Sequence, residues 1–147
     1  MELSHLTNLE ELDLSSTHLN GTPNIQDCKT LSRLKRLKSI NLSYNNFNKS
    51  IISCLTALPS LKILDLTSSF SWGSSFPVQG INLLIQSSLL IDHPAFASFH
   101  HLEVLDLSWN SFVGSVPSAI QALSSLRALS FARNKLNGSL PDHGRVV

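Results

Sequence analysis

Apolar residues recur along this chain in one short pattern, LxxLxxLxL, where L is apolar and x is mostly polar. The pattern occurs five times, and its last two apolar positions form an LxL pair each time. These pairs are Leu12 and Leu14, Ile40 and Leu42, Leu64 and Leu66, Leu105 and Leu107, and Leu129 and Phe131. Successive pairs lie 28, 24, 41 and 24 residues apart. Repetition at a period of about 20 to 50 residues predicts a solenoid, whose units bury their apolar side chains against their neighbours.

Each LxL pair predicts a short strand with its apolar side chains in the interior and its middle residue in water. The strand cores are expected near 12–14, 40–42, 64–66, 105–107 and 129–131. Because every unit runs the same way round the coil, the five strands are expected to form a parallel sheet. The leucines recur since each coil fills the same slot of a common core.

An interior polar column is expected three positions after each pair, where the chain turns out of the sheet. Asn45, Asn110 and Asn134 occupy it, while Thr17 and Ser69 stand there in the first and third coils. An Asn amide both donates and accepts, so stacked amides can pair the backbone groups that the turn leaves open. The column therefore predicts a hydrogen-bonded ladder that is weaker at Thr17 and Ser69.

Glycine and proline follow this column at regular offsets. The glycines are Gly21, Gly73, Gly114 and Gly138. Glycine at a fixed offset indicates a backbone angle that other residues avoid. Pro117 and Pro141 then predict an extended return path on the outer side.

The whole pattern, LxxLxxLDLSxNxFxGxxP, resembles the plant-type extracellular leucine-rich repeat of receptor-like proteins and receptor-like kinases. The resemblance covers most of 1–79 and 99–142. It implies an α/β solenoid, a right-handed coil with a short-stranded parallel sheet on its concave face and loops, 3-10 turns and short helices on its outer side. We expect a single leucine-rich repeat domain of about five coils over residues 1–147. Both ends of the chain fall within repeats, which predicts a truncated piece of a longer ectodomain.

Two stretches depart from the pattern. Within 24–38 there are four extra residues, and the leucine spacing predicts a short outer helix whose solvated side carries Arg33, Lys35, Arg36 and Lys38. An anion-binding patch is the alternative for these cations. At about 80–98 an irregular insertion separates the third and fourth coils, and we favour an added outer segment over a decayed repeat because it contains no LxL pair.

Composition and charge narrow the functional classes. Charged residues make up 14% of the chain and the formal net charge is +1, which does not indicate nucleic acid as a partner. The most apolar window, 81–91, is too short and too polar to cross a bilayer, and no signal-peptide pattern is visible. Localisation at the cell surface or outside the cell therefore follows from the resemblance alone, whose full-length members are anchored in the plasma membrane.

Two cysteines, Cys28 and Cys54, either pair or lie apart as small buried thiols. Their spacing marks neither a metal site nor a redox pair, and we favour the separate buried thiols.

No pattern for catalysis or for a cofactor emerges. His93, His100 and His101, with Asp92, match no zinc-ligand spacing, and the chain has no nucleophile-elbow motif. A solenoid surface also lacks the closed pocket that most chemistry requires. We therefore expect a protein that is not an enzyme and holds no metal or cofactor.

The candidate site is a strip on the concave face. Its outermost column carries Tyr44, Trp109 and Arg133, residue types that anchor interfaces, and we group Asp106 and Ser108 with them. One interpretation is that these residues contact a ligand or partner. The other is that they are ordinary exposed residues without a binding role.

Four Asn-x-Ser/Thr sequences begin at Asn20, Asn41, Asn48 and Asn137 and are candidate N-glycosylation sites. Three of them fall at the turn and outer side, where a glycan is tolerable. Asn41 falls on the concave face, where a glycan would obstruct binding.

The resemblance implies a non-catalytic binding module that recognises a protein or peptide ligand, or a co-receptor kinase, in cell-surface signalling or defence. Two alternatives stay open. One is a degenerate or purely structural repeat fragment, and the other is a soluble inhibitor of a cell-wall-degrading enzyme.

Overall fold

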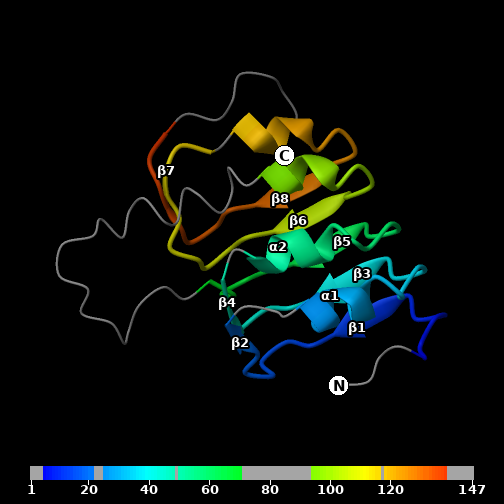
Figure 1. Cartoon of the computed structure of the whole chain (residues 1–147). Helices are drawn as coiled ribbons and strands as arrows, with labels where there is room; N and C mark the ends of the chain where they lie inside the picture. Colours follow the sequence, from blue (N-terminus) through cyan, green and yellow to red (C-terminus); the bar gives the residue numbers. More distant parts are fainter. Residues whose placement is uncertain (1–4, 22–24, 49, 71–93, 117, 139–147) are drawn as a thin grey trace.

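The computed structural model describes residues 5–21, 25–48, 50–70, 94–116 and 118–138. Its centre is one parallel sheet in which the strand order follows the chain, β1-β3-β5-β6-β8 (Figure 1). The strands are β1 (Glu11–Asp13), β3 (Ser39–Asn41), β5 (Ile63–Asp65), β6 (Val104–Asp106) and β8 (Ala128–Ser130). The predicted α/β solenoid is thus confirmed, with one strand of the sheet from each coil.

The register of the sheet follows the repeat. The first residues of the LxL pairs lie opposite one another, in the order Leu12, Ile40, Leu64, Leu105 and Leu129. Each strand is centred on this residue, one position earlier than the pair alone suggests. The second residue of the pair still continues the ladder, since the Leu66 amide donates to the Asp106 carbonyl at 2.9 Å.

Two small parallel sheets follow the turns that leave the main sheet. β2 (Asn20–Gly21) pairs with β4 (Asn46–Phe47), and β7 (Val113–Gly114) pairs with β9 (Lys135–Leu136). Gly114 has φ of +84°, as the sequence predicts for this column. Gly138 is required for a different reason, because a Cβ there would come within 2.5 Å of the Ser115 Cβ.

Short helices cover the convex side and stack in chain order (Figure 1). They are α1 (Ile25–Leu31), α2 (Ser50–Leu55) and the 3-10 helices η1 (Pro94–Ser98) and η2 (Ser118–Ala122). The helix expected within 24–38 exists but ends at Leu31. Leu34 and Leu37 are fully buried in the following turn. The basic run therefore lies beyond the helix, and its expected place on the helix surface is wrong.

The segment before the fourth coil needs one correction. η1 lies eleven residues before the strand centre Leu105, as η2 does before Leu129, so 94–98 is the regular outer turn of this coil rather than part of an insertion. Phe96 and Phe99 pack in the core, with ring centroids 5.9 Å apart. The remainder of the predicted insertion, 80–93, lies outside the described residues.

The core runs between the sheet and the convex helices. Leu64, Leu66, Leu105 and Leu107 are almost completely buried, and each such side chain contributes about 1.5 to 3 kcal/mol. At the flank beyond the strands, the Phe112 ring lies 6.1 Å from that of Phe70 in the coil before.

The predicted polar ladder is present. Asn110 Nδ2 donates to the carbonyl oxygens of Leu66 (3.0 Å), Leu107 (2.9 Å) and Ser108 (3.1 Å), and its Oδ1 accepts from the Phe70 amide (2.9 Å). Asn45 and Asn134 bond in the same way to their own and the preceding coil. Each Asn thereby fastens two coils, because at least half of its bonds cross between them.

The cysteines form a disulfide, so the separate thiols favoured above are wrong. Cys28 lies in α1 and Cys54 in α2, with Cα atoms 4.8 Å apart. Sequence spacing did not reveal the pairing, because the two helices meet only through the stacking of their coils.

Candidate functional site

The concave face is formed by the outward residues of the five strands and by the turn that follows each strand. Its middle column contains Asp13, Asn41, Asp65, Asp106 and Ser130. The next column contains Ser15, Ser43, Thr67, Ser108 and Ala132, of which Ser43 and Ser108 are only 4% and 6% exposed. Ser108 thus supports its neighbours, and its contact with a partner stays a prediction.

The turn after each strand has a residue with positive φ at the same repeat position, and we call these residues the turn column; His18, in the first coil, also has positive φ (59°) but lies outside this column. The turn column consists of Ser16 (φ 54°), Tyr44 (55°), Ser68 (50°), Trp109 (55°) and Arg133 (59°). This left-handed region costs an ordinary L-residue about 1 to 2 kcal/mol and is cheapest for Gly and Asn. The sequence analysis did not predict this backbone geometry. The residue with positive φ directly precedes the Asn column in every coil, so that column locates it.

Bulky side chains in the turn column gain little from burial. Tyr44 is 60% exposed and Trp109 is 59% exposed. The backbone cost is thus not offset by packing into the core. Folding alone does not account for an aromatic residue at either position.

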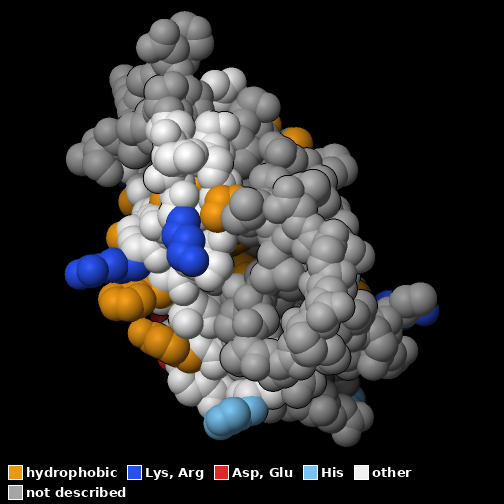
Figure 2. All heavy atoms as spheres, turned by 90° about the vertical axis from the view of Figure 1, so that its left-hand side faces the viewer, with side chains coloured by type: hydrophobic (Ala, Val, Ile, Leu, Met, Phe, Trp, Pro, Cys, Tyr) orange, Lys and Arg blue, Asp and Glu red, His pale blue; other side chains and the backbone are white. Residues whose placement is uncertain are grey.

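Trp109 and Arg133 come from adjacent coils and lie against each other. The Arg133 guanidinium carbon is 5.2 Å from the centroid of the Trp109 ring. Such a cation–π pair contributes about 0.5 to 1 kcal/mol at an exposed site. Figure 2 views the molecule from the flank, and hydrophobic and Lys or Arg side chains project together at the left-hand margin of that view.

Asp106 is held in place by its own coil. Its Oδ1 accepts from the Ser108 amide at 2.8 Å and from the Ser108 hydroxyl, and that hydroxyl lies 2.6 Å from the Ser130 hydroxyl. In the first coil, the Ser15 amide donates to Asp13 at 2.8 Å, and this bond holds the pKa of the Asp13 carboxyl below its usual value. In the third coil the Thr67 amide likewise donates to Asp65 Oδ1 at 2.8 Å, so each strand aspartate commits one oxygen to the turn that follows it.

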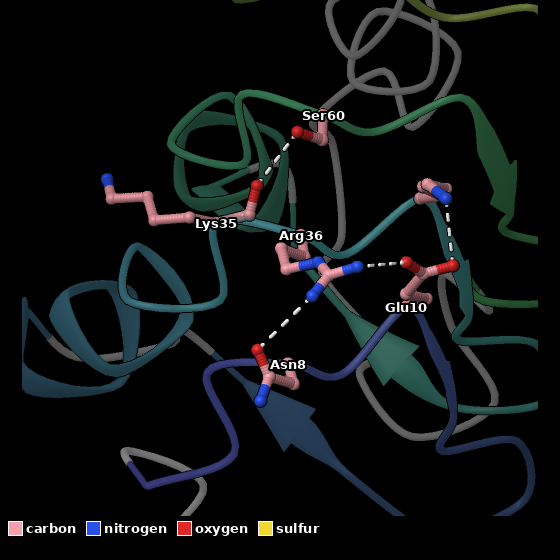
Figure 3. A network of polar contacts seen from close by, with 6 residues as sticks. Asn8, Glu10, Lys35, Arg36 and Ser60 are labelled. Atoms are coloured by element: carbon pink, nitrogen blue, oxygen red, sulfur yellow. Dashed lines mark hydrogen bonds and ion pairs between the residues drawn. The ribbon is translucent and has the colours of Figure 1, made fainter.

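Ion pairs follow the edge at which the chain enters the strands. Glu10 accepts from Lys38 at 2.8 Å and from Arg36 at 3.0 Å, while Arg36 also donates to Asn8 (Figure 3). The Lys38 hydrogen bond and charge, followed by the Arg36 charge, hold the pKa of Glu10 below its usual value. The sequence analysis missed these pairs because their partners lie in neighbouring coils.

A second group of ion pairs occupies the same edge of later coils. Glu103 accepts from Lys62 at 2.8 Å, and Arg127 lies 3.9 Å away. The hydrogen bond from Lys62 holds the pKa of the Glu103 carboxyl below its usual value.

The candidate glycosylation residues divide between two surfaces. Asn41 lies in β3 on the main sheet, whereas Asn20 lies in β2, Asn48 directly follows β4 and Asn137 directly follows β9. Three of the four therefore belong to the flank formed by the small sheets.

Within the part of the chain that the structure describes, no group of three or more His, Cys, Asp or Glu residues is arranged to hold a metal ion. His93 and Asp92 lie outside that part. Among the described residues, no helix has both the length and the apolar character needed to cross a membrane.

Comparison with known proteins identifies the repeats. A family model described as "Leucine Rich Repeat" matches residues 8–29, 36–58 and 101–123. Receptor-like protein 41 of Arabidopsis thaliana is 32% identical over 140 residues, which cover 94% of this chain and 14% of that protein. The calmodulin-binding receptor kinase CaMRLK of the same plant is 34% identical over 135 residues, covering 86% of this chain and 20% of the kinase.

Solved structures agree with this assignment. The Arabidopsis receptor kinase HAESA, in complex with the peptide hormone IDA and the co-receptor SERK1, superposes with a TM-score of 0.58 at 25% identity, over 92% of this chain and 20% of that chain. An internalin C2 from Listeria monocytogenes, at 16% identity and a TM-score of 0.54, shares the fold over 90% of this chain and 56% of that chain.

The chain thus spans only about a seventh of the length of the plant receptor-like protein compared above. Its coils are leucine-rich repeats, and they are similar to those in the ectodomains of plant receptor-like proteins and receptor kinases.

Proposed function

We propose that this protein contributes a non-catalytic recognition surface to a plant cell-surface receptor, and that the turn column contacts a protein or peptide partner. The observation that carries this proposal is the pair of exposed aromatic residues, Tyr44 and Trp109, at positive φ. Aromatic and Arg side chains are the types that most often dominate binding energy in protein interfaces. The HAESA complex, with its peptide hormone and co-receptor, gives the proposal a precedent in a similar ectodomain.

The strip on the concave face carries different kinds of side chain at its two ends. Arg133 and Trp109 form its cationic and aromatic end, and Tyr44 lies two coils away across Ser68. Asp106 contributes a fixed carboxylate from the adjoining strand, while Ser108 keeps that carboxylate in position. A partner would therefore meet two aromatic faces with both charge signs close by.

Localisation outside the cell is part of the proposal. The Cys28–Cys54 disulfide supports it, since disulfides persist mainly in oxidising compartments such as the extracellular space. Candidate glycosylation sites on the flank are consistent with passage through the secretory pathway.

The test uses variants whose backbone suits the turn. Asn tolerates positive φ, so Tyr44→Asn and Trp109→Asn remove the aromatic rings without straining the coil. All proteins are produced in the bacterial periplasm, where the Asn-x-Ser sequence that Trp109→Asn creates with Ser111 carries no glycan. The full chain is panned against a displayed library of random linear peptides, and the selected peptides are titrated against each variant. We expect each aromatic substitution to weaken these peptides at least about tenfold, equal to about 1.4 kcal/mol.

Ser16→Asn, in the same column of the first coil, is the matched control and should leave the affinity unchanged. Peptides that bind Tyr44→Asn and Trp109→Asn as tightly as the unchanged protein would overturn the assignment of the strip. Failure of the library to yield any specific binder would count against a peptide-recognition role.

A further inference from the structure

We propose that copies of this protein stack head to tail in solution, with β8 of one copy pairing in parallel with β1 of the next. The two strands lie at opposite ends of the main sheet (Figure 1). Among the described residues each of them pairs with one neighbouring strand only, so each has an open edge that can pair with a further strand. The stack continues the coil from one copy into the next.

The repeat defines which backbone groups these two edges offer. In the four earlier coils, the amide of the residue that closes the LxL pair donates to the strand of the next coil at 2.8 to 2.9 Å; these residues are Leu14, Leu42, Leu66 and Leu107. Phe131 is the fifth member of this series, and within the described part of the chain its amide has no partner. In the stack it donates to the Asp13 carbonyl of the next copy, the acceptor that the repeat places there.

The entries to the strands offer the complementary groups. The Glu103 carbonyl accepts from the amides of Arg127 (2.7 Å) and Ala128 (3.0 Å) in the next coil, as the carbonyls at the same position of the earlier coils do. Arg127 holds this position in the last strand, and its carbonyl accepts no bond from the residues that the structure describes. Glu10 and Glu11 hold the donor positions in the first coil. One register of pairing therefore satisfies both edges at once.

Side-chain charge favours the same register. The residue at the strand entry is Glu10, Lys38, Lys62, Glu103 and Arg127 in successive coils. Glu10 accepts from Lys38 at 2.8 Å, and Glu103 accepts from Lys62 at 2.8 Å. Arg127 is 3.9 Å from Glu103 and its side chain is 80% exposed. In the stack, Glu10 of the next copy follows Arg127 and lies between two cations, as Glu103 does within the chain.

Apolar side chains at the two ends are incompletely covered. Leu42, Leu66 and Leu107, which close the LxL pairs of the inner coils, are 3%, 0% and 0% exposed. Leu14 and Phe131 hold the same repeat position in the first and last coils and are only partly buried. Stacking covers one with the other, and removal of this apolar surface from water favours the contact.

Two different surfaces meet in this contact, so it is heterologous. Each dimer keeps one free end of each kind, and association therefore continues as concentration rises. The turn column also continues, because Arg133 of one copy is followed by Ser16 and Tyr44 of the next. The inference does not depend on whether that column binds a peptide, since the contact lies between the ends of the sheet.

The test follows the mass of the full chain by sedimentation velocity over a wide range of concentration, with protein from the bacterial periplasm, where the disulfide forms. Arg127→Glu reverses the exposed charge of the last coil. Glu11→Pro removes an amide donor from the open edge of β1, a position where a strand tolerates proline. Lys35→Glu makes the same charge reversal at an exposed residue of the second coil and is the matched control.

We expect the average mass of the unchanged protein and of Lys35→Glu to rise with concentration. Each end variant should need at least about tenfold more protein for the same rise. An equimolar mixture of Arg127→Glu and Glu11→Pro should form dimers and nothing larger, because the mixture offers one intact end of each kind. Unchanged melting temperatures show that the variants fold, and Glu11→Lys replaces Glu11→Pro if proline unfolds the first coil.

Three results would overturn the inference. They are an unchanged protein that stays monomeric at every concentration, an end variant that associates as the unchanged protein does, and a mixture of the two end variants that stays monomeric. Association of Arg127→Glu alone into dimers would assign the contact to two copies of the same end instead.

Discussion

The junction between the first two coils and the junction between the third and fourth coils are held in part by different means. At the later junction, β5 and β6 bury their leucines almost completely, and the Asn110 amide bonds to both coils inside the core. At the first junction, Leu12 and Leu14 are only partly buried, while the Asn45 amide bonds to both coils as Asn110 does. That junction gains a disulfide between Cys28, in the segment leading from the first coil to the second, and Cys54, while its ion pairs to Glu10 have a counterpart in Lys62 and Glu103 at the later junction.

This difference shows that the repeat supplies a common geometry but not a common source of stability. At both junctions a single Asn amide satisfies the turns of two coils, and an ion pair joins the strand entries. Where the leucines are less buried, a disulfide between outer helices is added. Substitutions should therefore have unequal effects at equivalent positions of the repeat.

Asn110→Ala should cause the largest loss. Its amide serves three carbonyl groups and one backbone amide, and Asn110 is only 7% exposed. Each buried polar group left unpaired costs about 1 to 3 kcal/mol, so we expect a loss of about 4 kcal/mol in the free energy of unfolding, measured by urea titration. The matched control is the exposed neighbouring residue Ser111, whose change to Ala should have almost no effect.

Removal of the disulfide should cause the second-largest loss in the free energy of unfolding. The double change Cys28→Ser and Cys54→Ser opens a loop with a sequence separation of 26 residues, for which chain entropy gives about 3 kcal/mol. Urea titration of the variant, beside the unchanged protein with and without reductant, measures this loss. If reductant destabilises the unchanged protein but not the double variant, the effect belongs to the bond rather than to the new serines.

Ser69 and Thr17 occupy the same repeat position and provide a direct comparison. The Ser69 hydroxyl is buried and donates to the Leu42 carbonyl at 2.7 Å, while the Thr17 hydroxyl donates to the Leu14 carbonyl at 2.7 Å in an exposed setting. Ser69→Ala should cost about 1.5 kcal/mol and Thr17→Val about 0.5 kcal/mol, because water replaces the lost partner only at the exposed site. Equal losses in urea titration would contradict the distinction between the buried and the exposed setting of this repeat position.

Glu10→Gln should have the smallest effect, and that effect should depend on pH. The pKa of Glu10 lies below its ordinary value of 4.5 because Lys38 and Arg36 favour the charged form. A lowered pKa in the folded state contributes stability above the ordinary pKa, and this contribution disappears as pH falls through the folded value. The melting temperatures of variant and unchanged protein should differ slightly at pH 7 and converge near pH 3, with less difference in high salt.

Glu11→Gln is the control for this measurement, since Glu11 is exposed and no ion pair joins its side chain to another of the described residues. A pH-dependent change in melting temperature at Glu11 equal to that at Glu10 would show that net charge, rather than the ion pair, sets the effect.

The sequence predicted the structural features that recur with the period of the repeat. The LxL pairs indicated the strands and their register, and the Asn column indicated the ladder, because both follow directly from filling the same slot in every coil. Contacts between coils at non-repeating positions escaped prediction. The disulfide, the Glu10 ion pairs and the small sheets all join residues whose proximity depends on how outer segments of different length stack.

The candidate site was predicted only in part. Tyr44, Trp109 and Arg133 were found because they vary within a fixed column, and the structure adds that this column has positive φ. The burial of Ser108 was not predicted, because alternation along a strand does not hold at the turn, where its hydroxyl bonds back to Asp106. Whether the strip contacts a partner stays a prediction for the binding experiment.

The spacing of the turn column has a consequence for selectivity. Neighbouring coils are about 4.8 Å apart, whereas an extended chain advances about 3.3 Å per residue, so a linear ligand lying along the column cannot match one residue to each coil. Tyr44 and Trp109, two coils apart, are separated by about 10 Å, or roughly three residues of such a ligand. This surface would thus discriminate between ligands by the spacing of side chains along the ligand rather than by a single pocket.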